Sequence, residues 1–164
     1  MAFKPGILHM MIGPSGAGKS TYIKTVVRGR VIDRRWVVSS DDLREEITGD
    51  PMDQSANRQV FAAMHSIIHA RIVNGLVAFV DATNINTRDR FSVRNCAPDN
   101  ARIVYHVVDR PLADKHRTAG WRADVRINGL SLIDYHHEKF QKELQNILLG
   151  DDDQRVTVLD MRIM

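Results

Sequence analysis

The sequence predicts an α/β fold in which helices flank a parallel β-sheet. Short apolar runs rich in β-branched residues alternate along the chain with longer segments of helical periodicity, which is typical of strand–helix–strand units. The 164 residues suffice for one domain of ordinary size, and 43% hydrophobic with 26% charged residues is close to the globular average. We therefore expect one domain, residues 1–164, with a normal buried core.

Five apolar runs are expected to form the strands of this sheet. They are residues 7–12, 36–38, 76–80, 103–108 and 156–159. Every connection between them is long enough to hold a crossover helix, so successive strands can run in the same direction.

Two helices have clear signals. In residues 54–73, apolar side chains recur at spacings of three and four: Ala56, Val60, Ala63, Met64, Ile67, Ile68 and Ile72. A second helix is expected to begin at Ser131, which can cap it together with Asp134, and to end at Leu149 before Gly150. Residues 111–129 are rich in cations and lack a long apolar stripe, so we expect a mobile surface excursion there.

Composition excludes several classes of protein. The single cysteine, Cys96, rules out an intramolecular disulfide and a zinc site built on cysteines; we expect it to be a small core residue. No apolar run approaches the roughly 18 residues of a membrane span. With a single cysteine, a location in the reducing cytoplasm is expected. The net charge of +3 allows a polyanionic partner without requiring one.

The segment after the first predicted strand carries the strongest motif. Residues 13–20 match G-x-x-x-x-G-K-[ST] in full: Gly13, Pro14, Ser15, Gly16, Ala17, Gly18, Lys19 and Ser20. Thr21 follows as a further candidate for nucleotide binding, and the motif opens a helix that carries Tyr22, Ile23 and Val26. Glycines let backbone N–H groups approach phosphate oxygens, Lys19 would reach the β and γ phosphates, and the Ser20 hydroxyl would bind Mg²⁺. We expect a site for ATP or another nucleoside triphosphate with Mg²⁺; the alternative is a tight glycine turn without a ligand.

Polar residues at two other strand ends are candidates for the chemistry. Asp41 follows the strand at 36–38, where its carboxylate can accept the proton of an attacking hydroxyl. Arg44, three residues later, could hold an acceptor phosphate. Asp42 is the alternative candidate for the acid, but the spacing of three residues to Arg44 favours Asp41. The structural alternative is that Asp41 belongs to an N-cap, because Ser-Ser-Asp is typical of a helix start. Both can hold at once, with Ser40 or Asp42 as the cap.

Asp81 stands at the end of the most apolar strand, in the sequence Asp-Ala-Thr-Asn. A carboxylate at that point could orient a water bound to Mg²⁺. The alternative is a polar turn.

These segments together resemble the polynucleotide 5′-hydroxyl kinases of bacterial and phage end-healing enzymes, over about residues 7–126. The resemblance implies a P-loop kinase-type sheet with a mobile, arginine-bearing lid at about residues 111–129. It also implies transfer of the ATP γ-phosphate to the 5′-OH of DNA or RNA, with Asp41 as general base and Arg44 on a phosphate. Arg117 and Arg122 would close over the ATP phosphates, with Arg126 as a third candidate. A phosphatase or ligase would act alongside, on another chain or domain.

Two other functions stay open. A kinase of a small metabolite, such as a sugar acid, nucleotide or antibiotic, would share the P-loop, the lid and the strand-end carboxylate. A nucleotide-gated switch is disfavoured, because the Asn-Lys-x-Asp guanine signature is absent.

The remaining polar clusters each have two interpretations. Arg88, Arg90 and Arg94 could face a nucleic-acid backbone, but an ordinary solvated helix face is the preferred reading. Trp121 could stack on a base, although packing of the lid is preferred. His136 and His137 are expected at the surface.

Overall fold

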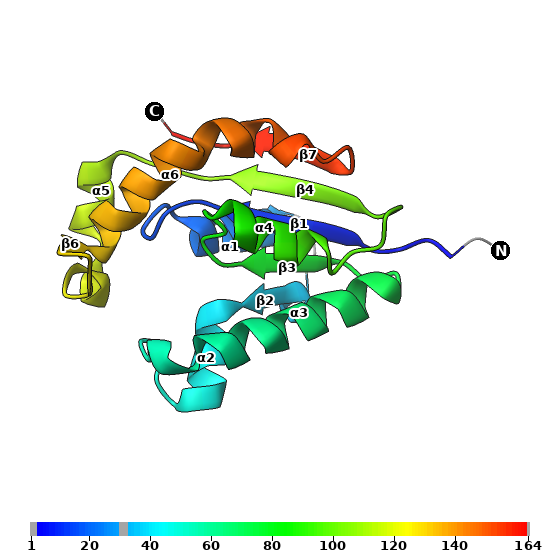
Figure 1. Cartoon of the computed structure of the whole chain (residues 1–164), viewed down its shortest axis with the longest axis horizontal. Helices are drawn as coiled ribbons and strands as arrows, with labels where there is room; N and C mark the ends of the chain where they lie inside the picture. Colours follow the sequence, from blue (N-terminus) through cyan, green and yellow to red (C-terminus); the bar gives the residue numbers. More distant parts are fainter. Residues whose placement is uncertain (1–2, 30–32, 164) are drawn as a thin grey trace.

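Five parallel strands form the central sheet of the computed structural model, which describes residues 3–29 and 33–163 (Figure 1). The strand order is β2-β3-β1-β4-β7, which confirms the predicted α/β fold with a parallel sheet flanked by helices. The strands are β1 (Ile7–Ile12), β2 (Val37–Ser39), β3 (Ala78–Asp81), β4 (Arg102–Val107) and β7 (Val156–Asp160). The helices are α1 (Lys19–Gly29), α2 (Ser40–Thr48), α3 (Asn57–Val73), α4 (Thr87–Arg94), α5 (Leu112–Arg117) and α6 (Leu132–Leu148).

The strand register aligns the carboxyl ends of the strands along one edge of the sheet. Leu8 in β1 lies opposite Ala78 in β3 and Ile103 in β4. Ser39, the last residue of β2, lies opposite Asp81, the last residue of β3. Residues that follow these strands are therefore brought together even though they are far apart in the sequence.

The two predicted helices are present with small shifts at their ends. A short 3-10 turn, η2 (Gln54–Ala56), precedes α3, whose residues Val60, Met64, Ile68 and Ile72 are buried against the sheet. The Ser131 hydroxyl caps α6 by accepting a hydrogen bond from the backbone N–H of Asp134 at 3.1 Å, as predicted. None of the helices in the described part of the chain has the length and apolarity to cross a membrane.

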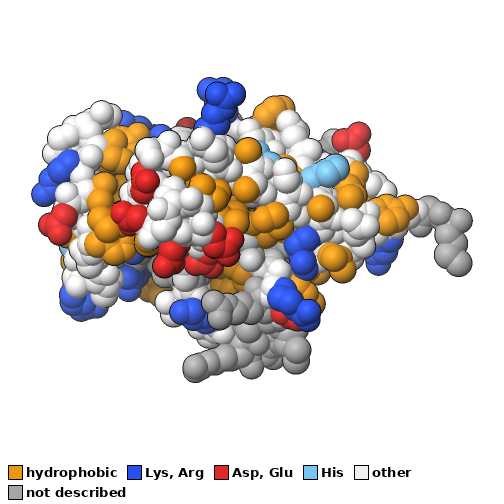
Figure 2. Space-filling view, turned by 90° about the horizontal axis from the view of Figure 1, so that it is seen from below, with side chains coloured by type: hydrophobic (Ala, Val, Ile, Leu, Met, Phe, Trp, Pro, Cys, Tyr) orange, Lys and Arg blue, Asp and Glu red, His pale blue; other side chains and the backbone are white. Residues whose placement is uncertain are grey.

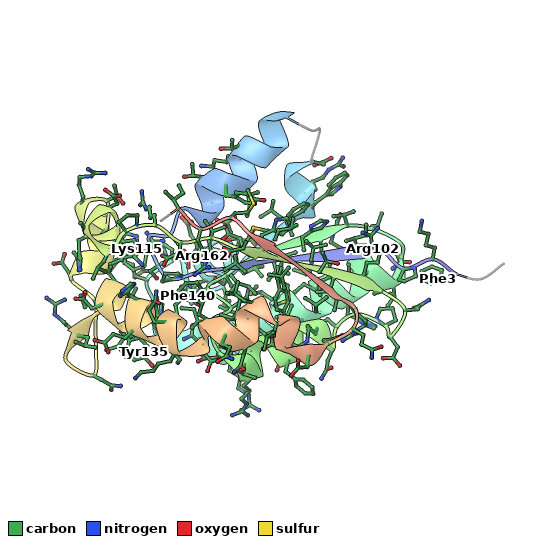
Figure 3. All side chains as sticks on the ribbon, turned by 90° about the horizontal axis from the view of Figure 1, so that it is seen from above. Phe3, Arg102, Lys115, Tyr135, Phe140 and Arg162 are labelled. Atoms are coloured by element: carbon green, nitrogen blue, oxygen red, sulfur yellow. The ribbon has the colours of Figure 1, made fainter. Side chains whose placement is uncertain are left out.

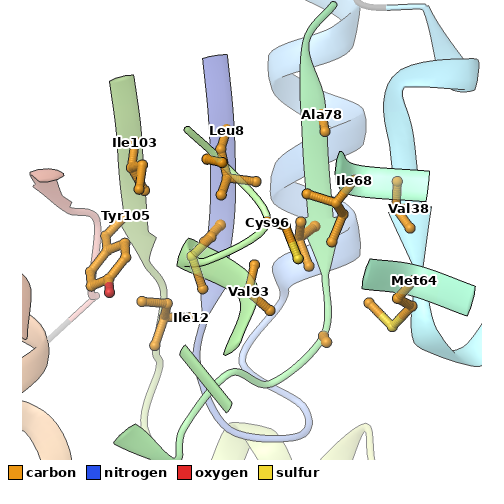
Figure 4. Packing of buried hydrophobic residues seen from close by; sticks show 14 of the residues in the cluster. Leu8, Ile12, Val38, Met64, Ile68, Ala78, Val93, Cys96, Ile103 and Tyr105 are labelled. Atoms are coloured by element: carbon orange, nitrogen blue, oxygen red, sulfur yellow. The ribbon is translucent and has the colours of Figure 1, made fainter. Parts of the chain in front are cut away.

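The main hydrophobic core lies between the sheet and the helices α3, α4 and α6. Leu8, Ile12, Ile103 and Tyr105 of β1 and β4 pack there, and Cys96 joins them as the predicted core residue (Figure 4). Burial raises the pKa of the Cys96 thiol to about 11, so the thiol stays protonated. A smaller cluster on the opposite face joins the sheet to α1.

The segment 111–129 contains more regular structure than its composition suggested. It forms α5, the 3-10 turn η3 (Gly120–Ala123) and the first strand of a hairpin, β5 (Arg126–Ile127) with β6 (Leu130–Ser131). Lys115 in α5 is fully buried, and its ammonium donates to Asp109 Oδ1 at 2.8 Å and contacts His137 Nδ1 at 2.9 Å. Figure 3 places Lys115 at the end of the molecule opposite Arg102 and Phe3. The base of the lid is therefore tied to the sheet by an internal ion pair.

Arg90 and Arg94 of α4 contradict both interpretations of this helix, the solvated face and the nucleic-acid surface. Arg90 is completely buried and Arg94 is 5% exposed, so neither forms a solvated face or a nucleic-acid surface. Arg90 pairs with Asp151 and Glu143, and Arg94 pairs with Asp151 and Asp153. Arg90 also donates to the backbone carbonyls of residues 84 and 85. Arg90 and its ion pairs therefore hold the loop that follows β3. Of the three arginines in the sequence prediction, Arg88, Arg90 and Arg94, only Arg88 is exposed.

Candidate active site

The P-loop, residues 13–20, connects β1 to α1 at the carboxyl edge of the sheet. A side chain at Gly13 would place its Cβ 2.1 Å from the carbonyl oxygen of Val108. Gly16 and Gly18 have φ of +79° and +92°, a region that glycine adopts without strain. Gly13 N–H donates to the carbonyl of Thr83 at 3.0 Å, which joins the P-loop to the loop after β3. Only glycine at these positions leaves the backbone free to surround an anion.

Lys19 extends its ammonium over the P-loop backbone. Its Nζ donates to the carbonyl oxygens of Gly13 and Pro14 at 3.0 Å each. Burial lowers the pKa of Lys19 to about 8, although Asp81 and Asp41 nearby act to raise it. A lysine held by two carbonyl oxygens can exchange them for phosphate oxygens, which carry more negative charge.

Ser20 and Asp81 meet at the start of α1, where the Ser20 hydroxyl donates to Asp81 Oδ2 at 2.8 Å. Hydroxyl and carboxylate oxygens are the hard ligands that Mg²⁺ prefers, and this ion commonly keeps several waters and phosphate oxygens. Within residues 3–29 and 33–163, no group of three or more His, Cys, Asp and Glu side chains forms a metal site. Ser20 and Asp81 therefore fit a Mg²⁺ ion that is held in addition by nucleotide phosphates and water.

Asp41 and Arg44 lie on one side of the first turn of α2. Arg44 Nη1 donates to Asp41 Oδ1 at 2.9 Å; the Arg44 side chain is 6% exposed and that of Asp41 46%. Ser39 is the residue that caps this helix, because its Oγ accepts from the N–H of Asp42 at 3.3 Å. The expectation that Ser40 or Asp42 acts as the cap was wrong, since the helix begins one residue earlier. The Asp41 carboxylate is thus not used in capping.

The structure brings one of the three lid arginines to this pair. Arg122 Nη2 lies 3.3 Å from Asp41 Oδ2, and its guanidinium stacks on the Trp121 ring, 4.5 Å from the ring centre. Trp121 thus packs within the lid, in line with the preferred reading. Arg117 is 73% exposed and pairs with Asp114 in its own helix. Arg126 is exposed and donates to the carbonyl of Ala123. In the described part of the chain, neither Arg117 nor Arg126 forms a hydrogen bond or ion pair with a P-loop residue.

Two residues that the sequence analysis missed contact the P-loop. His136 Nδ1 lies 2.6 Å from Ser15 Oγ, because α6 passes beside the loop, so His136 is not the surface residue expected. Burial, with help from Lys19, Lys139 and Arg122, lowers the pKa of His136 to about 4. Arg110 donates to the carbonyl of Gly16 at 2.6 Å. Its position after β4 was a usable signal, because strand ends carry the other site residues; nothing in the local sequence marks His136.

The remaining predicted nucleotide-binding residues lie along the same segment. Pro14, Ser15 and Ala17 are buried, whereas Thr21 is exposed in the first turn of α1. The positive end of the α1 dipole faces the P-loop, which favours an anion there.

The sequence matches the family described as AAA domain (AAA_33) over residues 8–128. The chain belongs to this family. No curated protein matches the chain significantly.

Solved structures similar to this chain include a chain of the Pnkp1/Rnl/Hen1 RNA repair complex, at TM-score 0.70 and 23% identity. That match covers 88% of this chain and 47% of the other, so this chain spans about half the length of that one. The Mycobacterium tuberculosis APS kinase CysC, in complex with AMPPNP and APS, matches at TM-score 0.57 and 17% identity. That match covers 86% of this chain and 98% of the APS kinase. A sugar kinase from Janibacter sp. HTCC2649 matches at TM-score 0.54 and 16% identity. That match covers 95% of this chain and 86% of the sugar kinase. The chain thus has the P-loop kinase-type fold.

Proposed function

We propose that the protein transfers the γ-phosphate of ATP to the 5′-OH end of DNA or RNA, in the healing of nucleic-acid ends. The observation that carries the proposal is the assembly of Asp41 with Arg44 and Arg122 beside Lys19. An acid in this position can serve a hydroxyl acceptor, while the cations around it suit phosphate groups.

Each group then has a role in an in-line transfer. Asp41 takes the proton of the acceptor hydroxyl as its oxygen bonds to the γ-phosphorus, and the bond to the β–γ bridging oxygen breaks to release ADP. Lys19 and Arg122 stabilise the charge on the transferring phosphoryl group. Mg²⁺, which would be held by Ser20 and by Asp81 through water, neutralises phosphate charge when it is bound. The protein contributes mostly positioning.

The cations near Asp41 favour an acceptor that itself carries phosphate. A nucleic-acid end has a phosphate one nucleoside away from its 5′-OH, so both groups can lie in one site. The outer side of α2 is acidic, with exposed Asp42, Glu45 and Glu46, and acidic side chains gather on the face seen in Figure 2. The acceptor strand is therefore expected to pass on the Arg44 side and not across this surface.

The similarity to a chain of an RNA repair complex supports the same acceptor. It also supports the idea that a phosphatase or a ligase acts alongside, on another chain or domain.

A kinase of a small metabolite is the second candidate. The similarity to the APS kinase extends over 98% of that chain, although its TM-score is lower than that of the repair-complex chain.

The test is transfer of labelled γ-phosphate from ATP with Mg²⁺ to a 5′-OH oligonucleotide. The same oligonucleotide bearing a 5′-phosphate is the control, beside a panel of nucleosides, sugar acids and adenylyl sulfate. Label on the 5′-OH strand alone supports the proposal. Label on a small molecule alone moves the function to a metabolite, and no label on any acceptor contradicts a phosphotransferase.

A further inference from the structure

Asn57, the first residue of α3, holds the inner side of Arg44. Its Oδ1 accepts two hydrogen bonds from that guanidinium, from Nη2 at 2.9 Å and from Nε at 3.3 Å. Its Nδ2 donates to Gln54 Oε1 at 3.0 Å. Because the amide nitrogen donates on one side and the oxygen accepts on the other, the orientation of Asn57 is determined by both neighbours.

A neutral amide is an unusual partner for a guanidinium as buried as this one. Arg90 shows the common arrangement in the same molecule: its Nε and Nη2 both donate to the Asp151 carboxylate, at 2.7 Å each. Such a bidentate pair neutralises the cation. Arg44 presents the same Nε and Nη2 atoms to Asn57, which orients them without supplying charge.

Asp41 is consequently the only carboxylate that pairs with Arg44 in the described part of the chain. Asp53 lies near enough for Arg44 to help lower its pKa, but its carboxylate is turned to its own loop, where it accepts from Ser55 N–H at 2.8 Å. Arg122 contacts the second oxygen of Asp41. Arg44, Arg122 and Asp41 therefore carry a combined charge of +1, which a carboxylate at position 57 would cancel.

We propose that Asn57 is a positioning residue, which fixes the Arg44 guanidinium through a neutral amide so that Arg44 keeps its charge for Asp41 and for phosphate near it. The inference rests on the proposed function, because it assigns the charge of Arg44 to the acceptor side of the same site. It explains why this position holds an amide where stability alone would favour a carboxylate.

The Asn57→Asp variant tests the inference, because it keeps the shape and the acceptor oxygen and adds only a charge. A carboxylate would bind the guanidinium more strongly than the amide does. We expect unfolding by urea to be unchanged or to require more denaturant, whereas kcat with a 5′-OH acceptor falls at least tenfold. KM for ATP stays within about twofold, and the acidic limb of the pH–rate profile moves. If Asn57 served only as a hydrogen-bond acceptor, the variant would be as active as the wild type.

Gln59→Glu is the matched control, since Gln59 is exposed in the same first turn of α3 and gains the same charge. We expect its kcat and pH profile to match those of the wild type. Asn57→Ala should be both less stable and less active, which separates loss of orientation from gain of charge. Equal losses in Asn57→Asp and Gln59→Glu would overturn the inference, because the effect would then be a general one of charge.

A second measurement does not depend on activity. In a double-mutant cycle on stability, Asp41→Asn should lower the ratio of folded to unfolded protein at least fivefold when Asn57 is present, because Arg44 loses its one carboxylate. In the Asn57→Asp background, Asp41→Asn should lower the ratio of folded to unfolded protein less than twofold. Equal losses in the two backgrounds would overturn the inference even if no acceptor were phosphorylated, whereas the proposed function fails if the wild type transfers no phosphate to a 5′-OH end.

Discussion

Arg122 Nη2 lies 3.3 Å from Asp41 Oδ2, although 81 residues separate them in the sequence. The contact joins the lid to the first turn of α2, so that the acid expected to receive a proton is held between Arg122 and Arg44. Because Asp41 and Arg122 both influence the pKa of Lys19, the three groups belong to one electrostatic unit.

Replacing Asp41 by Asn should abolish most transfer without loss of nucleotide binding. A general base typically contributes 10²- to 10⁴-fold, so we expect kcat to fall by about 10³. Asp42→Asn is the control, because Asp42 is exposed next to Asp41 and should tolerate the change. Steady-state transfer and calorimetric binding of a non-hydrolysable ATP analogue measure the two effects. Comparable losses in both variants would remove Asp41 from the mechanism.

Nucleotide affinity should fall as the pH rises through about 8. Phosphate binds the charged form of Lys19, and burial lowers the pKa of this lysine to about 8 in the free protein. Above that pH, Lys19 must therefore take up a proton for each nucleotide that binds. Titration with the ATP analogue between pH 6.5 and 9.5 measures this. Lys19→Met should bind more weakly and lose the dependence; a wild-type affinity that is constant across the range would contradict the prediction.

The three lid arginines should differ in their importance. Since Arg122 contacts Asp41 whereas Arg117 and Arg126 are bonded within the lid, we expect Arg122→Ala to lower kcat by about 10³ or more. The other two alanine variants should lose less than about tenfold. Parallel kcat measurements with saturating ATP decide the order, and a larger loss at Arg117 would show that the lid rearranges around nucleotide.

Removal of Arg90 should destabilise the fold strongly. The Asp151 side chain beside it is 4% exposed, so Arg90→Met leaves a buried carboxylate with part of its compensation missing. We expect the free energy of unfolding, measured with urea, to fall by about 3–5 kcal/mol in Arg90→Met. The same measurement should show a loss of about 0.5 kcal/mol or less for Arg88→Met, because Arg88 is on the exposed side of α4. Similar values for both would mean that the cluster contributes little.

Acid should weaken the fold between about pH 6.5 and pH 4. Burial lowers the pKa values of His9, His106 and His136 to about 4, from about 6.5 in the unfolded chain. In this window the unfolded state binds more protons, so stability falls as pH falls, by about 1.4 kcal/mol per pH unit for each histidine. Urea unfolding at pH 7, 6 and 5 measures the slope, and His136→Gln should reduce it. A stability that does not change over this range would contradict the burial of these rings.

The elements with local signals were predictable from the sequence. Strand patterning, the stripe of α3 and the Ser131 cap depend on residues close together in the chain, and the glycines of the P-loop answer a local backbone requirement. The placement of Asp41 and Asp81 at one edge also follows from pattern, because parallel strands all end there.

Other features were decided by contacts between distant segments. Arg90 and Arg94 look like a solvated face until Asp151, about sixty residues away, folds onto them. His136 becomes a neighbour of Ser15 because α6 crosses the P-loop, and Arg122 is selected among three lid arginines by its reach to Asp41. The sequence by itself determined the sheet, its main helices and the phosphate-binding loop, since propensity and periodicity act locally. Only the tertiary structure decided which charges are buried and paired, because the free energy of a charge depends on partners that the fold brings from elsewhere in the chain.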